Sequence, residues 1–106
     1  MNYLDDLADA IQSLISPELL PTGDTRDLFR MYAVLALAKG DRVVADDVHD
    51  AWTAWMTARD PSHSSLRPLT ELPPDVQASD RPYLEAVRTV ARERNLGRDA
   101  RRRETR

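Results

Sequence analysis

The apolar centre of this chain is residues 25–40, TRDLFRMYAVLALAKG. A helix built from this stretch is apolar on most of its sides, and such a helix is usually buried in the middle of its domain. Thr25, or Asp24 before it, is a good N-cap for that helix. Lys39 followed by Gly40 is a typical helix end, because a cation and a glycine of positive φ both suit a C-terminus. The pattern predicts a central helix that ends at Lys39.

Two amphipathic stretches flank this centre. Residues 3–16 and residues 45–59 place apolar side chains at steps of three and four, the period of one helical face. Pro17 ends the first stretch, and Asp60 before Pro61 ends the second, because a residue that precedes proline avoids helical dihedrals. We expect two helices here. Their apolar residues are Leu4, Leu7, Ala8, Ile11, Leu14 and Ile15 in the first, and Val48, Ala51, Trp52, Trp55 and Met56 in the second.

Residues 60–82 form a connection rich in proline, with five of the seven prolines of the chain. Spaced apolar anchors indicate an ordered loop laid over the helices, with single helical turns near Thr70 and Pro74. A last helix begins near residues 79–82. The anchors are Leu66, Leu69, Leu72 and Val76, and the inner face of the last helix comprises Tyr83, Leu84, Val87, Val90 and Ala91.

These elements predict an all-α fold, a compact single domain of about four helices with a long ordered loop before the last helix. We place the domain at residues 1–97. Residues 98–106 form a basic tail without large apolar side chains. The tail arginines, all candidates for partner binding, are Arg98, Arg101, Arg102, Arg103 and Arg106.

The composition argues against several function classes. The chain has no cysteine, which excludes disulfides and zinc–thiolate sites, and only three glycines, none in a phosphate-binding motif. No stretch approaches the ~20 apolar residues of a membrane span. The acidic start, with Asp5 and Asp6, is unlike a signal peptide, so we expect a cytoplasmic protein, in the host cytoplasm if a phage encodes it. No cofactor is expected.

Charge is unevenly distributed along the chain. Residues 1–80 hold 14 acidic and 6 basic side chains, and residues 81–106 hold 4 acidic and 9 basic ones. The basic end suits an acidic protein partner or the acidic part of a second copy. Nucleic acid is a less favoured partner, because the pI is about 5.3 and no aromatic side chain interrupts the arginine tail.

One cluster of polar residues resembles a chemical site. Asp46, Asp47, His49 and Asp50 include pairs one helical turn apart, as a metal site requires. The alternative, which we prefer, is that the aspartates stabilise a helix N-terminus and His49 packs beside Trp52. We therefore do not predict a metal site. No serine lies in a nucleophile elbow, and for this reason we do not predict an enzyme.

The two tryptophans allow two arrangements. Both can fill the core, or one can pack inside while the other lines a groove under the loop. Tryptophan and arginine are enriched among binding hot spots, and Trp55 with Arg59 is therefore a candidate binding face.

The order of five short motifs resembles that of ryanodine-receptor-type repeat domains. The motifs are VHDAW at residues 48–52, DPSH at 60–63, LRPL at 66–69, ELP at 71–73 and DR at 80–81. The resemblance covers about residues 44–92, and the whole chain is similar to small proteins of actinobacteria and their phages. The chain departs from the family pattern at Ser64, where proline is usual, and at Leu69, where an aromatic residue is usual.

The resemblance implies a helical module that recognises a ligand, such as a nucleotide, or a protein partner, without catalysis. The matching positions would tie the loop to the preceding helix, with a buried His63 bound to the backbone or a carboxylate and Leu72 packed on Trp52. The positions carried over are His49, Trp52, His63, Pro68, Glu71, Leu72 and Asp80.

Two function hypotheses follow from these observations. The first, which we favour on the sequence, is a non-enzymatic protein-interaction module that binds a protein partner or forms a homodimer. The second is a small-ligand sensor, with a pocket between residues 45–59 and the loop, where His49, His63 and Arg67 receive an anionic group.

Overall fold

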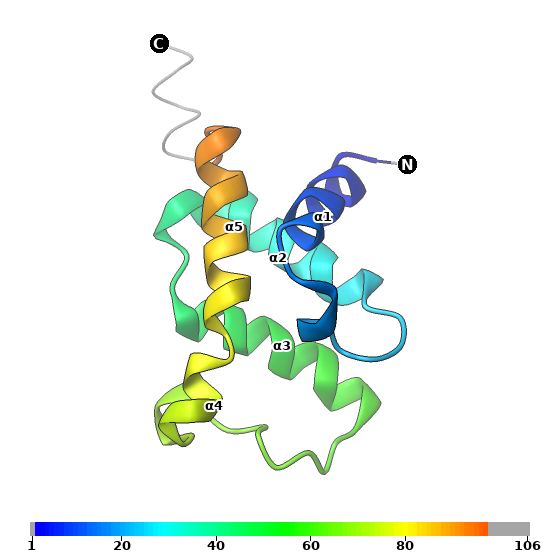
Figure 1. Cartoon of the computed structure of the whole chain (residues 1–106), viewed down its shortest axis with the longest axis vertical. Coiled ribbons are helices and arrows are strands. Elements are labelled where there is room, and N and C mark those ends of the chain that lie inside the picture. Colours follow the sequence, from blue (N-terminus) through cyan, green and yellow to red (C-terminus); the bar gives the residue numbers. More distant parts are fainter. Residues whose placement is uncertain (1, 98–106) are drawn as a thin grey trace.

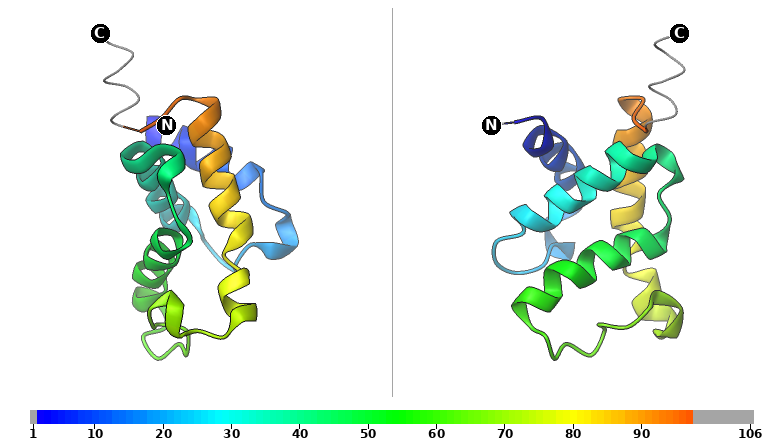
Figure 2. Two further views of the ribbon diagram at one scale, coloured as in Figure 1. Left: turned by 90° about the vertical axis from the view of Figure 1, so that its left-hand side faces the viewer. Right: turned by 180° about the vertical axis from the view of Figure 1, so that it is seen from behind.

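The computed structural model describes residues 2–97, and helix α2, Arg26–Lys39, lies at the centre of the fold (Figure 1). Helices α1, Tyr3–Ser13, α3, Ala45–Arg59, and α5, Arg81–Glu93, all pack against α2. Seen from behind, α2 and α3 run side by side and α5 crosses them (Figure 2). The described residues form helices and turns without any strand, so the predicted all-α class is confirmed.

The core consists of the apolar faces that these four helices turn towards one another. Leu28, Phe29 and Tyr32 of α2 are almost completely buried, together with Ile11 of α1 and Val87 of α5. Burial of each large apolar side chain contributes about 1.5–3 kcal/mol to folding, and this packing therefore holds the helices in place.

Two apolar residues lie outside the core, contrary to the prediction. Leu14 is 51% exposed because α1 ends at Ser13 rather than Ser16, and the chain turns before it reaches Pro17. Val34 is 50% exposed, so α2 is central but presents one side to solvent. When a helix is apolar on most of its sides, its sequence does not show which side stays exposed to solvent after the neighbouring helices have packed.

The start of α2 and the bounds of α3 agree with their local signals. α2 begins after Thr25, where the Asp24 carboxylate accepts a hydrogen bond from the backbone N–H of Arg26 at 2.9 Å. α3 has the predicted bounds and ends at Arg59, before Asp60 and Pro61. Proline and capping residues act within a few positions of the helix end, which is why the sequence alone locates these ends.

The short connection between α2 and α3 is tied to the last helix. Gly40 starts a 3₁₀ turn, Gly40–Arg42, and the buried Val43 follows it. The guanidinium Nε of Arg88, on α5, donates to the Val43 carbonyl at 2.7 Å. Gly97, after the end of α5, lies against Gly40 backbone to backbone.

The proline-rich connection is ordered, as predicted. It contains a 3₁₀ turn, Leu69–Glu71, and a short helix, α4, Pro74–Ala78, where two single helical turns were expected. Leu69 and Leu72 are buried and anchor the segment. The connection passes from the end of α3 to the start of α5 and so places a loop beside α3 (Figure 1).

Candidate functional site

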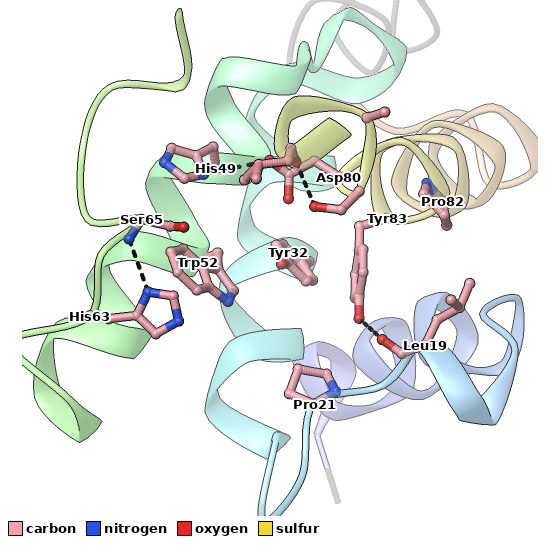
Figure 3. A pocket seen from close by; sticks show the side chains of 13 residues that line it. Leu19, Pro21, Tyr32, His49, Trp52, His63, Ser65, Asp80, Pro82 and Tyr83 are labelled. Carbon is pink, nitrogen blue, oxygen red and sulfur yellow. Dashed lines mark hydrogen bonds and ion pairs between the residues drawn. The ribbon is translucent and has the colours of Figure 1, made fainter. Parts of the chain in front are cut away.

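A cavity of about 410 Å³ opens between α3, the connection that follows it and the start of α5. This volume lies within the range of small-molecule pockets. The exposed lining is mainly apolar, with aromatic rings and a few polar groups (Figure 3). The lining residues are Leu19, Pro21, Tyr32, His49, Trp52, His63, Ser65, Val76, Ala78, Ser79, Asp80, Pro82 and Tyr83.

His49 joins three segments at the edge of this pocket. Its Nε2 donates to the Arg67 carbonyl at 2.7 Å, since a carbonyl only accepts. Its Nδ1 lies 3.5 Å from an Asp80 carboxylate oxygen, and the side chain is 4% exposed. Because the first proton of the ring is on Nε2, the contact between Nδ1 and the Asp80 carboxylate needs a second proton. That proton is shared between Nδ1 and the carboxylate oxygen in a hydrogen bond. Both ring nitrogens of His49 therefore contact groups of the protein, and these contacts connect α3 to the loop and to the start of α5.

Asp80 precedes the first residue of α5 and lies inside the fold. Burial raises the pKa of its carboxyl group above the ordinary value of 3.8, and the charge and hydrogen bond of His49 partly oppose that shift. The side chain is 14% exposed, more than that of His49, so Asp80 is the more accessible member of the pair.

Trp52 lies between the two histidines. It stacks on the His49 ring, with centroids 5.5 Å apart, and meets the His63 ring edge to face at 5.1 Å. The His63 Nδ1 accepts a hydrogen bond from the backbone N–H of Ser65 at 3.0 Å. In the neutral ring the proton of His63 then resides on Nε2, which is a donor beside the pocket.

The structure agrees with only part of the role expected of His63. Its Nδ1 is bound to the backbone, at Ser65, as predicted, but the side chain is half-buried, whereas His49 is buried and contacts both a backbone carbonyl and the Asp80 carboxylate. The reason is the register of α3, which points His49 towards Asp80, a residue that only the fold brings near.

Two tyrosines complete the pocket, and the sequence analysis had assigned both to the core. Tyr32 is 1% exposed overall, and no hydrogen bond to its hydroxyl occurs within residues 2–97. The Tyr83 hydroxyl donates to the Leu19 carbonyl at 2.5 Å. Burial, and then the charge of Asp80, raise the pKa of both phenols. A tyrosine rather than a phenylalanine at a core position is the signal that could have drawn attention to them, because its hydroxyl needs a polar surrounding.

The tryptophans adopt the second of the two arrangements considered. Trp55 packs inside and is 5% exposed, while Trp52 lines the pocket under the loop. The Arg59 guanidinium lies 4.3 Å from the centroid of the Trp55 ring and donates to the Asp24 carbonyl at 2.9 Å. Arg59, itself exposed, therefore covers the buried Trp55, and this contact is made within the protein rather than with a partner.

Arg67 does not line the pocket, contrary to the anion-binding hypothesis. Its carbonyl binds His49, but its guanidinium lies on the surface, where it pairs with Glu71 at 3.4 Å. Because the Arg67 side chain points outwards, no arginine or lysine of the described part of the chain lines the pocket.

The acidic cluster at the start of α3 disperses around the helix. Asp47 accepts hydrogen bonds from the Lys39 ammonium at 2.9 Å and from the Val44 backbone N–H at 3.0 Å, and Asp46 and Asp50 are exposed. Across residues 2–97 no group of three or more histidine, aspartate or glutamate side chains is placed to hold a metal ion. The tail arginines Arg98, Arg101, Arg102, Arg103 and Arg106 lie outside the described residues.

The comparisons with known proteins give one match. A family model described as "Domain of unknown function (DUF7701)" matches residues 2–92, which include every residue that lines the pocket. No curated protein and no solved structure matches the chain. In the described part of the chain, none of the helices has the length and apolar content of a membrane crossing.

Proposed function

Since the chain belongs to the family described as a domain of unknown function (DUF7701), we propose a function from its own geometry: it is a small-molecule-binding domain. The observation that carries this proposal is the pocket of about 410 Å³, in which aromatic rings from three helices surround a few polar groups. Concave, mostly apolar sites with convergent polar atoms are typical of ligand pockets. A cytoplasmic location, as the sequence suggested, is part of this proposal.

Unused hydrogen-bonding groups support the proposal. The Tyr32 hydroxyl has no partner among the described residues, and neither has the His63 Nε2. Both groups line the pocket, so each can form a hydrogen bond with a ligand that occupies it.

The resemblance to ryanodine-receptor-type repeats is compatible with this site. Four of the seven positions carried over from that family, His49, Trp52, His63 and Asp80, line the pocket. We propose that residues 44–92 are a module of that type and that the matching positions build its binding site. Because both nitrogens of His49 are engaged inside the protein, we propose binding rather than catalysis.

Substitution of Trp52 by alanine tests the pocket. We expect fragments identified by a thermal-shift screen of the unaltered protein to lose about thirtyfold in affinity, because a hot-spot aromatic contributes ~2 kcal/mol. In the screen, a fragment present at a hundred times its Kd adds about 2.7 kcal/mol of stability, or a rise in Tm of roughly 10 °C.

The matched control is Tyr3→Ala, an exposed aromatic residue on α1. Tyr3 is not part of the pocket lining, so its substitution should leave fragment affinity unchanged. The proposal would be wrong if a screen of aromatic, cationic and anionic fragments gave no binder. It would also be wrong if the fragments that bind kept their affinity for the Trp52→Ala variant.

A homodimer is the second candidate function, and an apolar groove between α2 and α3 favours it. Met31, Val34 and Ala51 line this groove of about 380 Å³, and the exposed Asp50 lies at it. The occupant we propose is the basic tail of a second copy, residues 98–106, whose arginines would lay their apolar stems on the groove and place their charges beside Asp50.

Light scattering at low and at high salt tests the dimer. We expect a dimer at low salt that dissociates at high salt, since screening weakens attraction between exposed charges. Val34→Asp should give a monomer at low salt as well. A monomer of the unaltered chain under both conditions would rule out this candidate.

A further inference from the structure

The charge of the pocket lining restricts what it can bind. Among residues 2–97, Asp80 is the only carboxylate of the lining, and no lysine or arginine lines the pocket. Arg67, the arginine that the anion-binding hypothesis placed beside the histidines, directs its guanidinium to Glu71 on the surface. An anionic group in this pocket would therefore face a carboxylate without an arginine or lysine to compensate.

The Asp80 carboxylate retains an unused acceptor. One of its oxygens lies 3.5 Å from the His49 Nδ1, and the other has no donor among residues 2–97. Its charge also reaches the other side of the pocket, because it contributes to the raised pKa of both Tyr32 and Tyr83. A ligand N–H at this oxygen would satisfy it, and a charged N–H donor would do so most strongly.

The aromatic rings favour the same ligand charge. In the view of Figure 3, Tyr32 lies between Trp52 and Tyr83, and Asp80 lies on one side of this row. Tryptophan and tyrosine rings attract cations through the negative charge of their faces. The Tyr32 hydroxyl, which has no protein partner within the described residues, is a further acceptor for a ligand N–H.

We propose that the pocket takes a small organic cation that carries N–H donors, such as an amidinium or a protonated amine, on an apolar body. This inference rests on the proposed function and names the ligand class of the same site. Asp80 receives the N–H groups, and the rings of Trp52, Tyr32 and Tyr83 hold the apolar body. The imidazole of His49 holds Asp80 in position through one carboxylate oxygen and leaves the other oxygen for the ligand.

Three probes of one shape and different charge test the ligand class: benzamidine, benzamide and benzoate. Affinities are measured by NMR titration at about pH 8, where an ordinary imidazole is neutral, with the indole N–H signals as reporters of the pocket. We expect benzamidine to bind about tenfold more tightly than benzamide, as a charge-assisted hydrogen bond predicts, and benzoate to bind most weakly.

Asp80→Asn should lower the affinity for benzamidine to that for benzamide and leave benzamide almost unchanged. Asp75→Asn removes the same charge from an exposed position on α4 outside the pocket lining and is the matched control, with no effect expected. The comparison of the three probes on the unaltered protein does not depend on whether Asp80→Asn folds.

The outcomes separate this inference from the function on which it rests. Equal or tighter binding of benzamide or benzoate, with shifts of the Trp52 indole, would overturn the cation class and leave a ligand pocket. Failure of every probe here, and of every fragment in the broader screen, would overturn both.

Discussion

Substitution of Gly40 by alanine should lower the free energy of unfolding by about 3 kcal/mol or more, a large share of the stability of a small domain. Gly40 has φ +62° and ψ −138°, a conformation that side chains disfavour. A Cβ atom there would also lie 2.4 Å from the Leu96 carbonyl oxygen and 3.2 Å from the Gly97 Cα. Both neighbours are backbone atoms, so relief of this contact requires the segment that follows α5 to move away from the turn.

Gly23→Ala is the matched control for Gly40→Ala. Gly23 has φ +88°, but its Cβ would meet only the end of the Arg59 side chain, at 3.2 Å. We expect a loss of about 1 kcal/mol from backbone strain alone. Urea denaturation of both variants measures the difference. Equal losses in the two variants would mean that the contact between Gly40 and Gly97 is not tight.

Substitution of His49 by leucine has the second large expected effect, a loss of about 3 kcal/mol near pH 7. Leucine fills much of the space of the imidazole but leaves the Arg67 carbonyl and the Asp80 carboxylate without their donor. Loss of a partner from a buried polar group costs more than the original bond contributes. Chemical denaturation measures the effect.

The dependence of this loss on pH identifies Asp80 as the group involved. Burial raises the pKa of Asp80, and without His49 nothing opposes that shift. A carboxyl group whose pKa is higher in the folded state stabilises the fold below 3.8, its ordinary value, and loses this contribution as pH rises through the folded pKa. The stability of His49→Leu should therefore decrease as pH rises above about 4.

The double variant His49→Leu/Asp80→Asn is the control for this titration. It lacks the carboxyl group, so its stability should depend less on pH in that window, and it should be more stable than His49→Leu at pH 7. If stability depended on pH in the same way in the single and double variants, the Asp80 carboxyl group would not be the cause of that dependence.

Local signals account for most of the helices. The bounds of α3 and the end of α2 follow from proline, glycine and capping residues a few positions away, and both were predicted. α1 was predicted three residues too long, because Leu14 and Ile15 continue the apolar period after the helix has ended at Ser13. Periodicity reports which residues are apolar and does not mark where the chain turns.

The candidate site was predictable only in part. His49, Trp52 and His63 were singled out from the sequence and they do lie together, but Tyr32 and Tyr83 were not. Their phenol rings come from α2 and α5, and in the sequence they resemble any other core positions. The two residues reach one pocket only after the helices have packed.

From its pattern of apolar and helix-ending residues alone, this chain could be recognised as a set of helices with an ordered, proline-rich connection, because neighbours along the chain govern such features. Packing decided that Trp52 rather than Trp55 faces the pocket, that His49 meets Asp80, and that Gly40 lies against Gly97. Each of these contacts joins segments far apart in the sequence. Their geometry depends on how the helices cross, and no short stretch of residues encodes a crossing.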